Sequence, residues 1–215
     1  MKFSRTNKQL IFLVAITSFI LLGNSSAADI VTNGSFEADD IPSTGYNDPG
    51  FITGWIVNED PANQVSLFDR PDLPAIDGTQ FVTFNGGGTA PTASISQTLS
   101  TIEGRFYDVS FWTGAHVPVN SGILGQVFDG VGTNGTAIAS EEGNIGTLTS
   151  LQETTFTFQA LSNSTTFVFA DSSTQTNGTD VFLDHLVINL VGVPEPSSIG
   201  LIAALGIVGG LRRRR

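Results

Sequence analysis

Residues 106–112 read FYDVSFW, a run in which every second side chain is apolar. In an extended chain, Tyr107, Val109 and Phe111 fall on one face, and the residues between and beside them fall on the other. A period of two residues is typical of a β-strand whose two faces meet different surroundings. The run therefore predicts a β-strand.

Comparable short runs recur between residues 29 and 193, where no segment has a sustained helical period. Glycine, asparagine, aspartate and proline separate them, as expected for turns. The clearest predicted strands are Thr79–Phe84, Ser94–Leu99, Phe106–Trp112, Thr154–Gln159, Thr165–Ala170 and Val181–Leu190. Weaker candidates are Asp29–Thr32, Phe51–Val57, Gln64–Phe68 and Leu124–Phe128. Short strands joined by polar turns predict an all-β fold, an antiparallel two-sheet jelly-roll sandwich.

The first 28 residues have the three parts of a secretory signal peptide. Lys2, Arg5 and Lys8 precede an apolar run over 10–22, and small residues follow it. We expect signal peptidase to cut before Asp29. The alternative is an uncleaved anchor, but the run is shorter than the roughly 20 residues that a spanning helix needs. The chain is therefore predicted to be exported.

Residues 29–192 are predicted to form a single domain with a strongly acidic surface. From Asp29 to Val193 there are 19 acidic side chains against Arg70 and Arg105, a formal charge of −17, and no cysteine. Such a surface repels nucleic acid, because phosphate binding rests on Lys and Arg. The charge either attracts divalent cations or simply keeps an exported protein soluble.

The last residues, 193–215, read VPEPSSIGLIAALGIVGGLRRRR and combine three elements. Two prolines precede an apolar run from Ile199 to Leu211, and four arginines, Arg212, Arg213, Arg214 and Arg215, end the chain. As a helix the apolar run is about 20 Å long, against a hydrocarbon core of about 30 Å. We predict a short transmembrane helix with the arginines on the cytoplasmic side.

This tail resembles the PEP-CTERM sorting signal of Gram-negative bacteria, with Val193, Pro194, Glu195 and Pro196 carrying the motif. In that family an exosortase in the inner membrane recognises the tail and is thought to cleave it. Family members are common in bacteria that make exopolysaccharide. The resemblance implies a transient stay in the inner membrane. A plain tail anchor is the alternative.

A second resemblance lies in the domain itself. VTNGSFE at 31–37, followed by Gly54-Trp55, resembles the opening of carbohydrate-binding-module-like jelly rolls of the galactose-binding-like group. SISQTL at 94–99, YDVSFW at 107–112 and FLD at 182–184 extend the match over nearly the whole domain. The resemblance implies the jelly-roll fold, and it implies less about the ligand because such domains diverge in what they bind.

Many jelly rolls of this type hold a structural calcium ion between the first and last strands. The resemblance places Glu37 and Asp184 among its ligands, and Asp39 or Asp40 is a third candidate. Oxygen ligands of this kind are those that calcium prefers. His185 stands where the family often has a second aspartate, which leaves the charge of the site open.

Alternation also bears on Asp184, which falls on the same face as Phe182, Leu186 and Ile188. We predict that this face is buried, and a buried carboxylate needs a partner. Calcium is one candidate partner. The alternative is that Asp184 caps a turn or binds backbone amides.

Sugar sites combine aromatic platforms with polar side chains. Tyr46, in the loop STGYNDPG, is the best candidate for an exposed aromatic residue, and Trp112 is a second. Trp55 and Trp112 both match family positions that usually lie in the core. Arg105, like Arg70, could clamp the carboxylate of an acidic sugar, and a salt bridge to a nearby aspartate is the alternative.

No catalytic motif is recognisable. The sequence has no Gly-x-Ser-x-Gly, no cysteine and no His-Glu-x-x-His, and Glu141-Glu142 is predicted to lie in a loop. We therefore predict a non-catalytic protein of the outer cell surface or biofilm matrix that binds exopolysaccharide. The alternatives are a structural surface protein without a glycan site and, less favoured, a polysaccharide-degrading enzyme.

Overall fold

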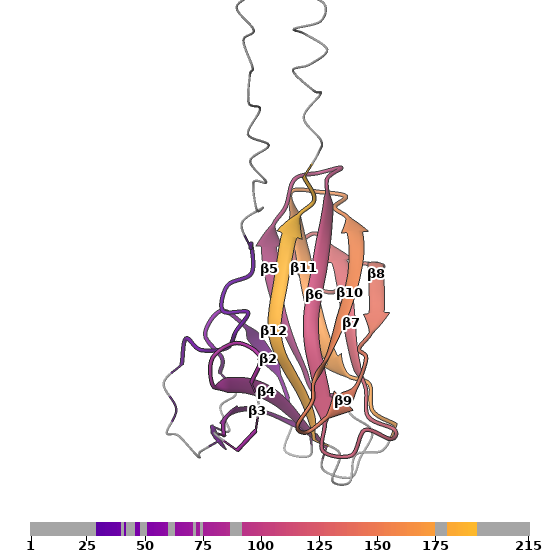
Figure 1. Cartoon of the computed structure of the whole chain (residues 1–215). Helices are drawn as coiled ribbons and strands as arrows, with labels where there is room; N and C mark the ends of the chain where they lie inside the picture. The colour runs from indigo at the N-terminus through magenta and orange to yellow at the C-terminus, as the bar shows by residue number, and fades with distance from the viewer. Residues whose placement is uncertain are drawn as a thin grey trace, which may run out of the picture.

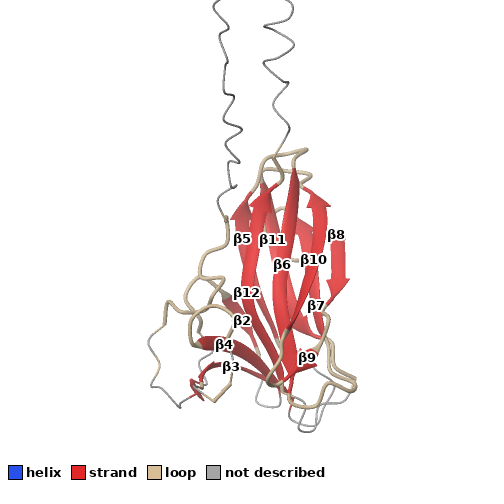
Figure 2. Cartoon of the chain, viewed as in Figure 1, coloured by secondary structure: helices blue, strands red, loops and turns tan. Residues whose placement is uncertain are grey.

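The computed structural model describes residues 29–39, 41, 46–47, 51–59, 63–70, 72–73, 75–86, 92–174 and 180–192. Within these ranges the chain forms twelve strands and no helix, arranged as two sheets packed face to face (Figures 1 and 2). The all-β two-sheet sandwich predicted from the sequence is confirmed. The described residues include no helix that is long and apolar enough to cross a membrane. The predicted signal peptide and the tail helix lie outside them.

The first sheet has the order β1-β3-β4-β12-β6-β10, with the short β9 beside β6. Its strands are β1 (Tyr46–Asn47), β3 (Asn63–Asp69), β4 (Gln80–Gly86), β6 (Phe106–Ala115), β9 (Gly146–Thr147), β10 (Gln152–Gln159) and β12 (Val181–Leu190). The second sheet has the order β2-β5-β11-β7-β8. Its strands are β2 (Ile56–Asn58), β5 (Ser94–Ser100), β7 (Ile123–Asp129), β8 (Ala137–Glu142) and β11 (Ser164–Asp171). All pairs are antiparallel except β6 with β9.

All six of the clearest predicted strands are strands in the structure, and three of the weaker runs overlap β2, β3 and β7. The fourth weak run contributes only an isolated bridge, between Asp29 and Asn189. Strands β1, β8 and β9 were not predicted. The prediction of a loop at Glu141-Glu142 is wrong, because both residues belong to β8, where their side chains are exposed at the edge of the second sheet.

The core lies between the sheets and is rich in phenylalanine. Phe111 on β6 meets Phe169 on β11 at a ring separation of 5.1 Å, and Phe158 meets Phe167 at 5.2 Å. Edge-to-face aromatic pairs of this kind add about 0.5–1.5 kcal/mol beyond their buried area. Trp55 is buried against Phe169, as the resemblance implied.

β12 carries a β-bulge next to its centre. Asp184 lies opposite Trp112 and Val187 lies opposite Ser110, so β12 has one residue more than β6 over the same length. His185, inside the bulge, has a φ of 49° in the left-handed region. A residue in this conformation is a common way to fit the extra residue of a bulge.

The bulge reverses the faces of β12 along its length. The core residues are Val181 and Leu183 before it and Leu186 and Ile188 after it. The prediction that Phe182 and Asp184 share the core face with Leu186 and Ile188 is therefore wrong. Phe182 instead packs against Phe81 on the outer face of the first sheet, with 5.2 Å between the rings.

The turn over residues 33–36 packs directly on this bulge. The Leu186 amide donates to the Gly34 carbonyl oxygen at 2.9 Å, and the Ile188 amide donates to Asp29 Oδ1 at 2.9 Å. A Cβ on Gly34 would overlap the Leu186 carbonyl group. The close approach of the two backbones explains why glycine is needed here.

Replacement of Gly34 by alanine should lower the free energy of unfolding by about 3 kcal/mol, because the added Cβ pushes the turn off the bulge. Urea unfolding of residues 29–192 measures this. Gly135→Ala is the matched control, since its Cβ would meet nothing closer than the Asp129 carbonyl oxygen at 3.8 Å. Equal midpoints for the two variants would contradict the packing argument.

Candidate functional site

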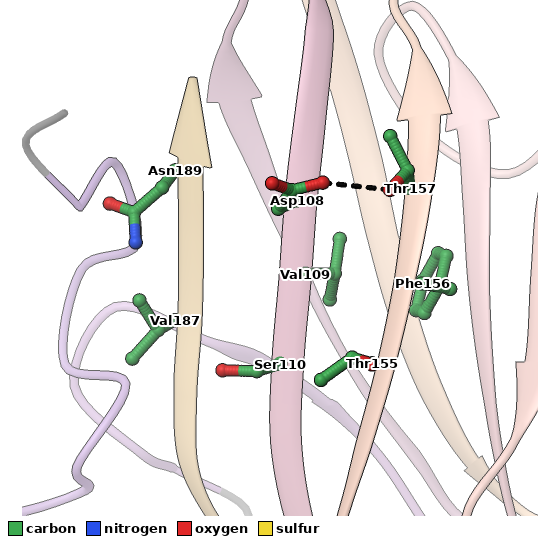
Figure 3. A pocket seen from close by; sticks show the side chains of 8 residues that line it. All are labelled: Asp108, Val109, Ser110, Thr155, Phe156, Thr157, Val187 and Asn189. Carbon is green, nitrogen blue, oxygen red and sulfur yellow. Dashed lines mark hydrogen bonds between the residues drawn. The ribbon is translucent and has the colours of Figure 1, made fainter. Parts of the chain in front are cut away.

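A groove of about 430 Å³ crosses the outer face of β12, β6 and β10 (Figure 3). Strand register sets its side chains in rows of three. One row is Val187, Ser110 and Thr155, and the next is Asn189, Asp108 and Thr157. Thr157 Oγ1 donates a hydrogen bond to Asp108 Oδ1 at 2.7 Å. The groove therefore offers carboxylate, amide and hydroxyl groups side by side.

The local sequence explains why these groups point outward. On β6 the alternating residues Tyr107, Val109 and Phe111 are buried in the core, so Asp108 and Ser110 must face away from it. The predicted alternation of 106–112 is confirmed. On β10 the inward residues include Thr154, which is buried and whose hydroxyl accepts a hydrogen bond from the Asn144 amide at 2.7 Å.

Trp112 lies on the same outer face as the groove. It is half-buried, whereas both of its chain neighbours, Phe111 and Thr113, are buried. The core position suggested by the resemblance is therefore wrong for Trp112. Two residues along a strand span about 7 Å, so Trp112 lies about 7 Å beyond Ser110 on β6, next to the first of the two polar rows. Phe106 lies on this face at the other limit and is half exposed.

The other predicted ligand-binding residues lie apart from Trp112. Arg105 precedes β6 and is about 24 Å along the strand from Trp112. Its Nε is buried and has no hydrogen-bond partner among the described residues. The prediction that Tyr46 lies in a loop is wrong, because Tyr46 belongs to the edge strand β1, opposite Phe68. Its side chain is outside what the structure describes. Arg105 and Tyr46 stay predictions as ligand-binding residues.

Arg70 is not available as a clamp for an acidic sugar. Its guanidinium makes two hydrogen bonds to Asp72, at 2.7 and 2.8 Å. The alternative that this arginine forms a salt bridge with a nearby aspartate is confirmed.

Asp184 is fully buried beneath the segment 75–79, and its carboxylate accepts three backbone hydrogen bonds. Oδ2 accepts from the amides of Ile76 at 2.5 Å and Asp77 at 3.2 Å, and Oδ1 accepts from His185 at 2.6 Å. The alternative that this carboxylate binds backbone amides is confirmed. Burial raises the pKa of Asp184 to about 6, although the three amides and His185 act in the opposite direction.

Glu37 holds the other end of the same segment. Its Oε1 accepts from the amides of Thr79 at 2.8 Å and Gln80 at 2.5 Å. Gln80 is itself buried, and its Oε1 has no partner among the described residues. Asp39 lies elsewhere, with its carboxylate bound to the amide and hydroxyl of Thr53 at 2.8 and 2.6 Å.

The three predicted calcium ligands are thus not brought together as a set. Within the described ranges no three His, Cys, Asp or Glu side chains converge as a metal site requires. Glu37 and Asp184 both accept hydrogen bonds from backbone amides of residues 76–80. The unpaired Oε1 of Gln80, whose amide group lies beside Glu37, is the feature that suits a cation. Their amide partners already fix the segment, so calcium stays a prediction.

The C-terminal residues 192–215 match the family described as the PEP-CTERM protein-sorting motif. The predicted sorting residues Val193, Pro194, Glu195 and Pro196 and the final arginines fall inside this match, although they lie outside the described residues. No curated protein matches the chain. The chain is therefore a protein with a PEP-CTERM sorting motif behind a jelly-roll-like β-sandwich.

Solved structures of similar fold include both carbohydrate-binding modules and enzymes. TmCBM61 in complex with β-1,4-galactotriose is 19% identical, with a TM-score of 0.55 over 76% of this chain and 99% of that one. A protein described as CBM4 is 17% identical, with a TM-score of 0.51 over 74% and 99%. A Stig cyclase from Fischerella sp. TAU is 15% identical, with a TM-score of 0.62 over 77% and 98%. At these identities the likeness concerns the fold.

The pKa of Asp184 predicts an unusual pH dependence of stability. Between about pH 4 and pH 6 the folded state keeps a proton that the unfolded state has lost, so this group lowers the free energy of unfolding as pH rises through that window. The full effect is on the order of 3 kcal/mol. Urea unfolding of the wild type and Asp184→Asn at several pH values measures it.

The difference between these two proteins isolates Asp184, because Asp171 and Asp180 also have pKa values raised by burial and titrate in both. We expect the stability difference to change across the window and to be constant above about pH 7. Parallel pH profiles would show that Asp184 does not titrate there.

Proposed function

We propose that this protein binds an extracellular polysaccharide, without catalysis, in the groove across β12, β6 and β10. The observation that carries the proposal is the pair of polar rows flanked by the outward-facing Trp112. Sugar hydroxyls hydrogen-bond to carboxylate, amide and hydroxyl groups such as those of Asp108, Asn189 and Thr157. The apolar face of a sugar ring packs on an indole, which combines a large apolar surface with one polar edge.

The charge of the groove favours a neutral glycan. Among the described residues that line it, Asp108 is the one with a charged side chain, and the domain as a whole carries a large negative charge. A chain of uronic acids would meet like charge here without a cation to offset it. Arg105, three residues from Asp108 along the strand, is the group that an acidic sugar would have to reach, about 10 Å away.

The tail supports a place of action outside the cytoplasm. Its sorting motif implies export and a transient stay at the membrane. We propose that an exosortase processes the tail and that the domain then resides on the outer cell surface or in the biofilm matrix. A glycan-binding domain without catalytic motifs suits that setting.

Substitution of Trp112 by alanine should weaken glycan binding at least tenfold, since stacking on one aromatic ring contributes on the order of 1.5 kcal/mol or more. The measurement is affinity for a panel of neutral and acidic polysaccharides. Phe51→Ala is the matched control, because Phe51 is an aromatic residue that is 63% exposed and lies outside β6, β10 and β12, the strands that carry the groove. Tyr46→Ala in the same panel tests the predicted aromatic platform on β1.

The same panel separates the alternatives. Saturable binding that survives Trp112→Ala would place the site elsewhere. No binding to any glycan, from a folded protein, would favour a structural surface protein. Release of reducing ends during incubation would favour a polysaccharide-degrading enzyme.

We further propose Glu37 and Asp184, with the unpaired Gln80 oxygen, as the residues that would hold calcium. The ion would supply positive charge between carboxylates in a strongly acidic domain. Calorimetric titration of calcium into the wild type and Glu37→Gln tests this. Saturable binding that Glu37→Gln abolishes is the expected result, and a wild type that binds no calcium would reject the proposal.

A further inference from the structure

We propose that one end of the sandwich, the end from which the tail departs, lies against the lipid bilayer while the tail is still attached. Exposed apolar side chains gather there. Ile102 is 54% exposed, Phe106 51%, Leu161 53% and Val131 80%. Exposed apolar residues that gather in one place mark a contact surface more often than scattered ones do. We call these four residues the tether-end patch.

The topology brings the patch together. Ile102 lies in the turn from β5 to β6, and Leu161 lies in the turn from β10 to β11. Backbone hydrogen bonds join the two turns: the Gly104 amide donates to the Ala160 carbonyl oxygen at 2.8 Å, and the Ala160 amide donates to the Arg105 carbonyl oxygen at 2.9 Å. The patch therefore rests on turns that are fixed to each other.

Val131 belongs to the same end of the molecule. It lies in the turn from β7 to β8, where the Gly130 amide donates to the Ser164 carbonyl oxygen at 2.9 Å. Ser164 begins β11 directly after the turn that carries Leu161. Three turns at the same end of the sandwich thus each carry an exposed apolar side chain.

The described chain leaves the sandwich at this end as well. The Val191 amide donates to the Phe106 carbonyl oxygen at 2.9 Å, and the described chain ends one residue later. The first described residue, Asp29, forms a bridge with Asn189 and so lies near the same end. Figure 1 shows β12 rising to the same end as the turn that precedes β6.

The sequence limits how far this end can be from a membrane. Residues 193–198 separate Gly192 from the apolar run that starts at Ile199, so the two are at most about 25 Å apart even when fully extended. The headgroup layer fills several ångströms of that distance. A short tether keeps the patch at a high effective concentration next to the bilayer.

Physical chemistry then favours contact. Apolar side chains gain free energy when they leave water for the boundary between headgroups and acyl chains. The turn before β6 carries both Glu103 and Arg105, whose charges offset each other. Asp129 at the end of β7 and Asp29 beside Asn189 lie at this end too, so the case for lipid contact rests on the exposed apolar side chains and on the short tether. The inference rests on the sorting tail and is independent of glycan binding.

The experiment uses the chain with its tail intact, reconstituted into vesicles of phosphatidylethanolamine and phosphatidylglycerol. The chain has no cysteine, so a single Leu161→Cys can be labelled with a polarity-sensitive fluorophore. Val119→Cys is the control. Val119 is 70% exposed, and it lies between the end of β6 at Ala115 and the start of β7 at Ile123, at the opposite end of the sandwich.

We expect lipids that carry a quencher to quench the label at 161 at least about threefold more than the label at 119. Equal quenching at both sites, or none at 161, would overturn the proposal. A spectral shift at 161 that needs no lipid and grows with protein concentration would indicate a second copy of the chain on the patch, and would also overturn it.

A second variant keeps the test independent of the labelled residue. With the label at Val131→Cys, the added change Ile102→Asp should reduce quenching by at least half, because a charge is costly at the acyl boundary. Trp112→Ala should leave quenching unchanged. Failure of membrane contact and failure of glycan binding are thus read out separately.

Discussion

The carboxylate of Asp184 is buried beneath the segment 75–79, with three backbone N–H groups pointing at it. The arrangement of side chains on both faces of the first sheet depends on this cluster. An unpartnered carboxylate at this depth would cost several kcal/mol, so the segment 75–79 has to stay over the sheet to supply two of the amides. The third comes from His185, whose left-handed backbone begins the bulge. The bulge then returns Leu186 and Ile188 to the core and leaves Val187 and Asn189 on the groove face.

Of the three strands that carry the groove, β6 and β12 place their side chains on its face for different structural reasons. β6 reaches it by plain alternation, which needs only that Tyr107, Val109 and Phe111 be buried. β12 reaches it through an irregularity that the Gly34 turn packs against. The register of the three paired strands sets the spacing of the polar rows before any ligand arrives, and preorganisation of this kind lowers the entropy lost on binding.

Alternation and turn chemistry predicted most of the sandwich, and physical reasons account for what they missed. β8 reads AIASEE, whose alanines and glutamates have low β propensity, so only its pairing with β7 makes it a strand. The bulge was hidden because β12 is apolar almost throughout, and one extra residue leaves no mark in such a run. For Trp112, alternation grouped it correctly with Asp108 and Ser110, but a resemblance to core positions outweighed that evidence. Two of the three amide partners of Asp184, Ile76 and Asp77, come from more than 100 residues away, which no local pattern can reveal.

Strand β8 has a consequence for how copies of this domain meet one another. It is the last strand of the second sheet, and an open strand edge is a template on which another copy can add its own strand. Glu141 and Glu142 stand exposed there. Two such edges brought together would place four carboxylates in close contact, and that repulsion opposes fibril growth. This edge of the second sheet therefore resists pairing with the same edge of another copy of the domain.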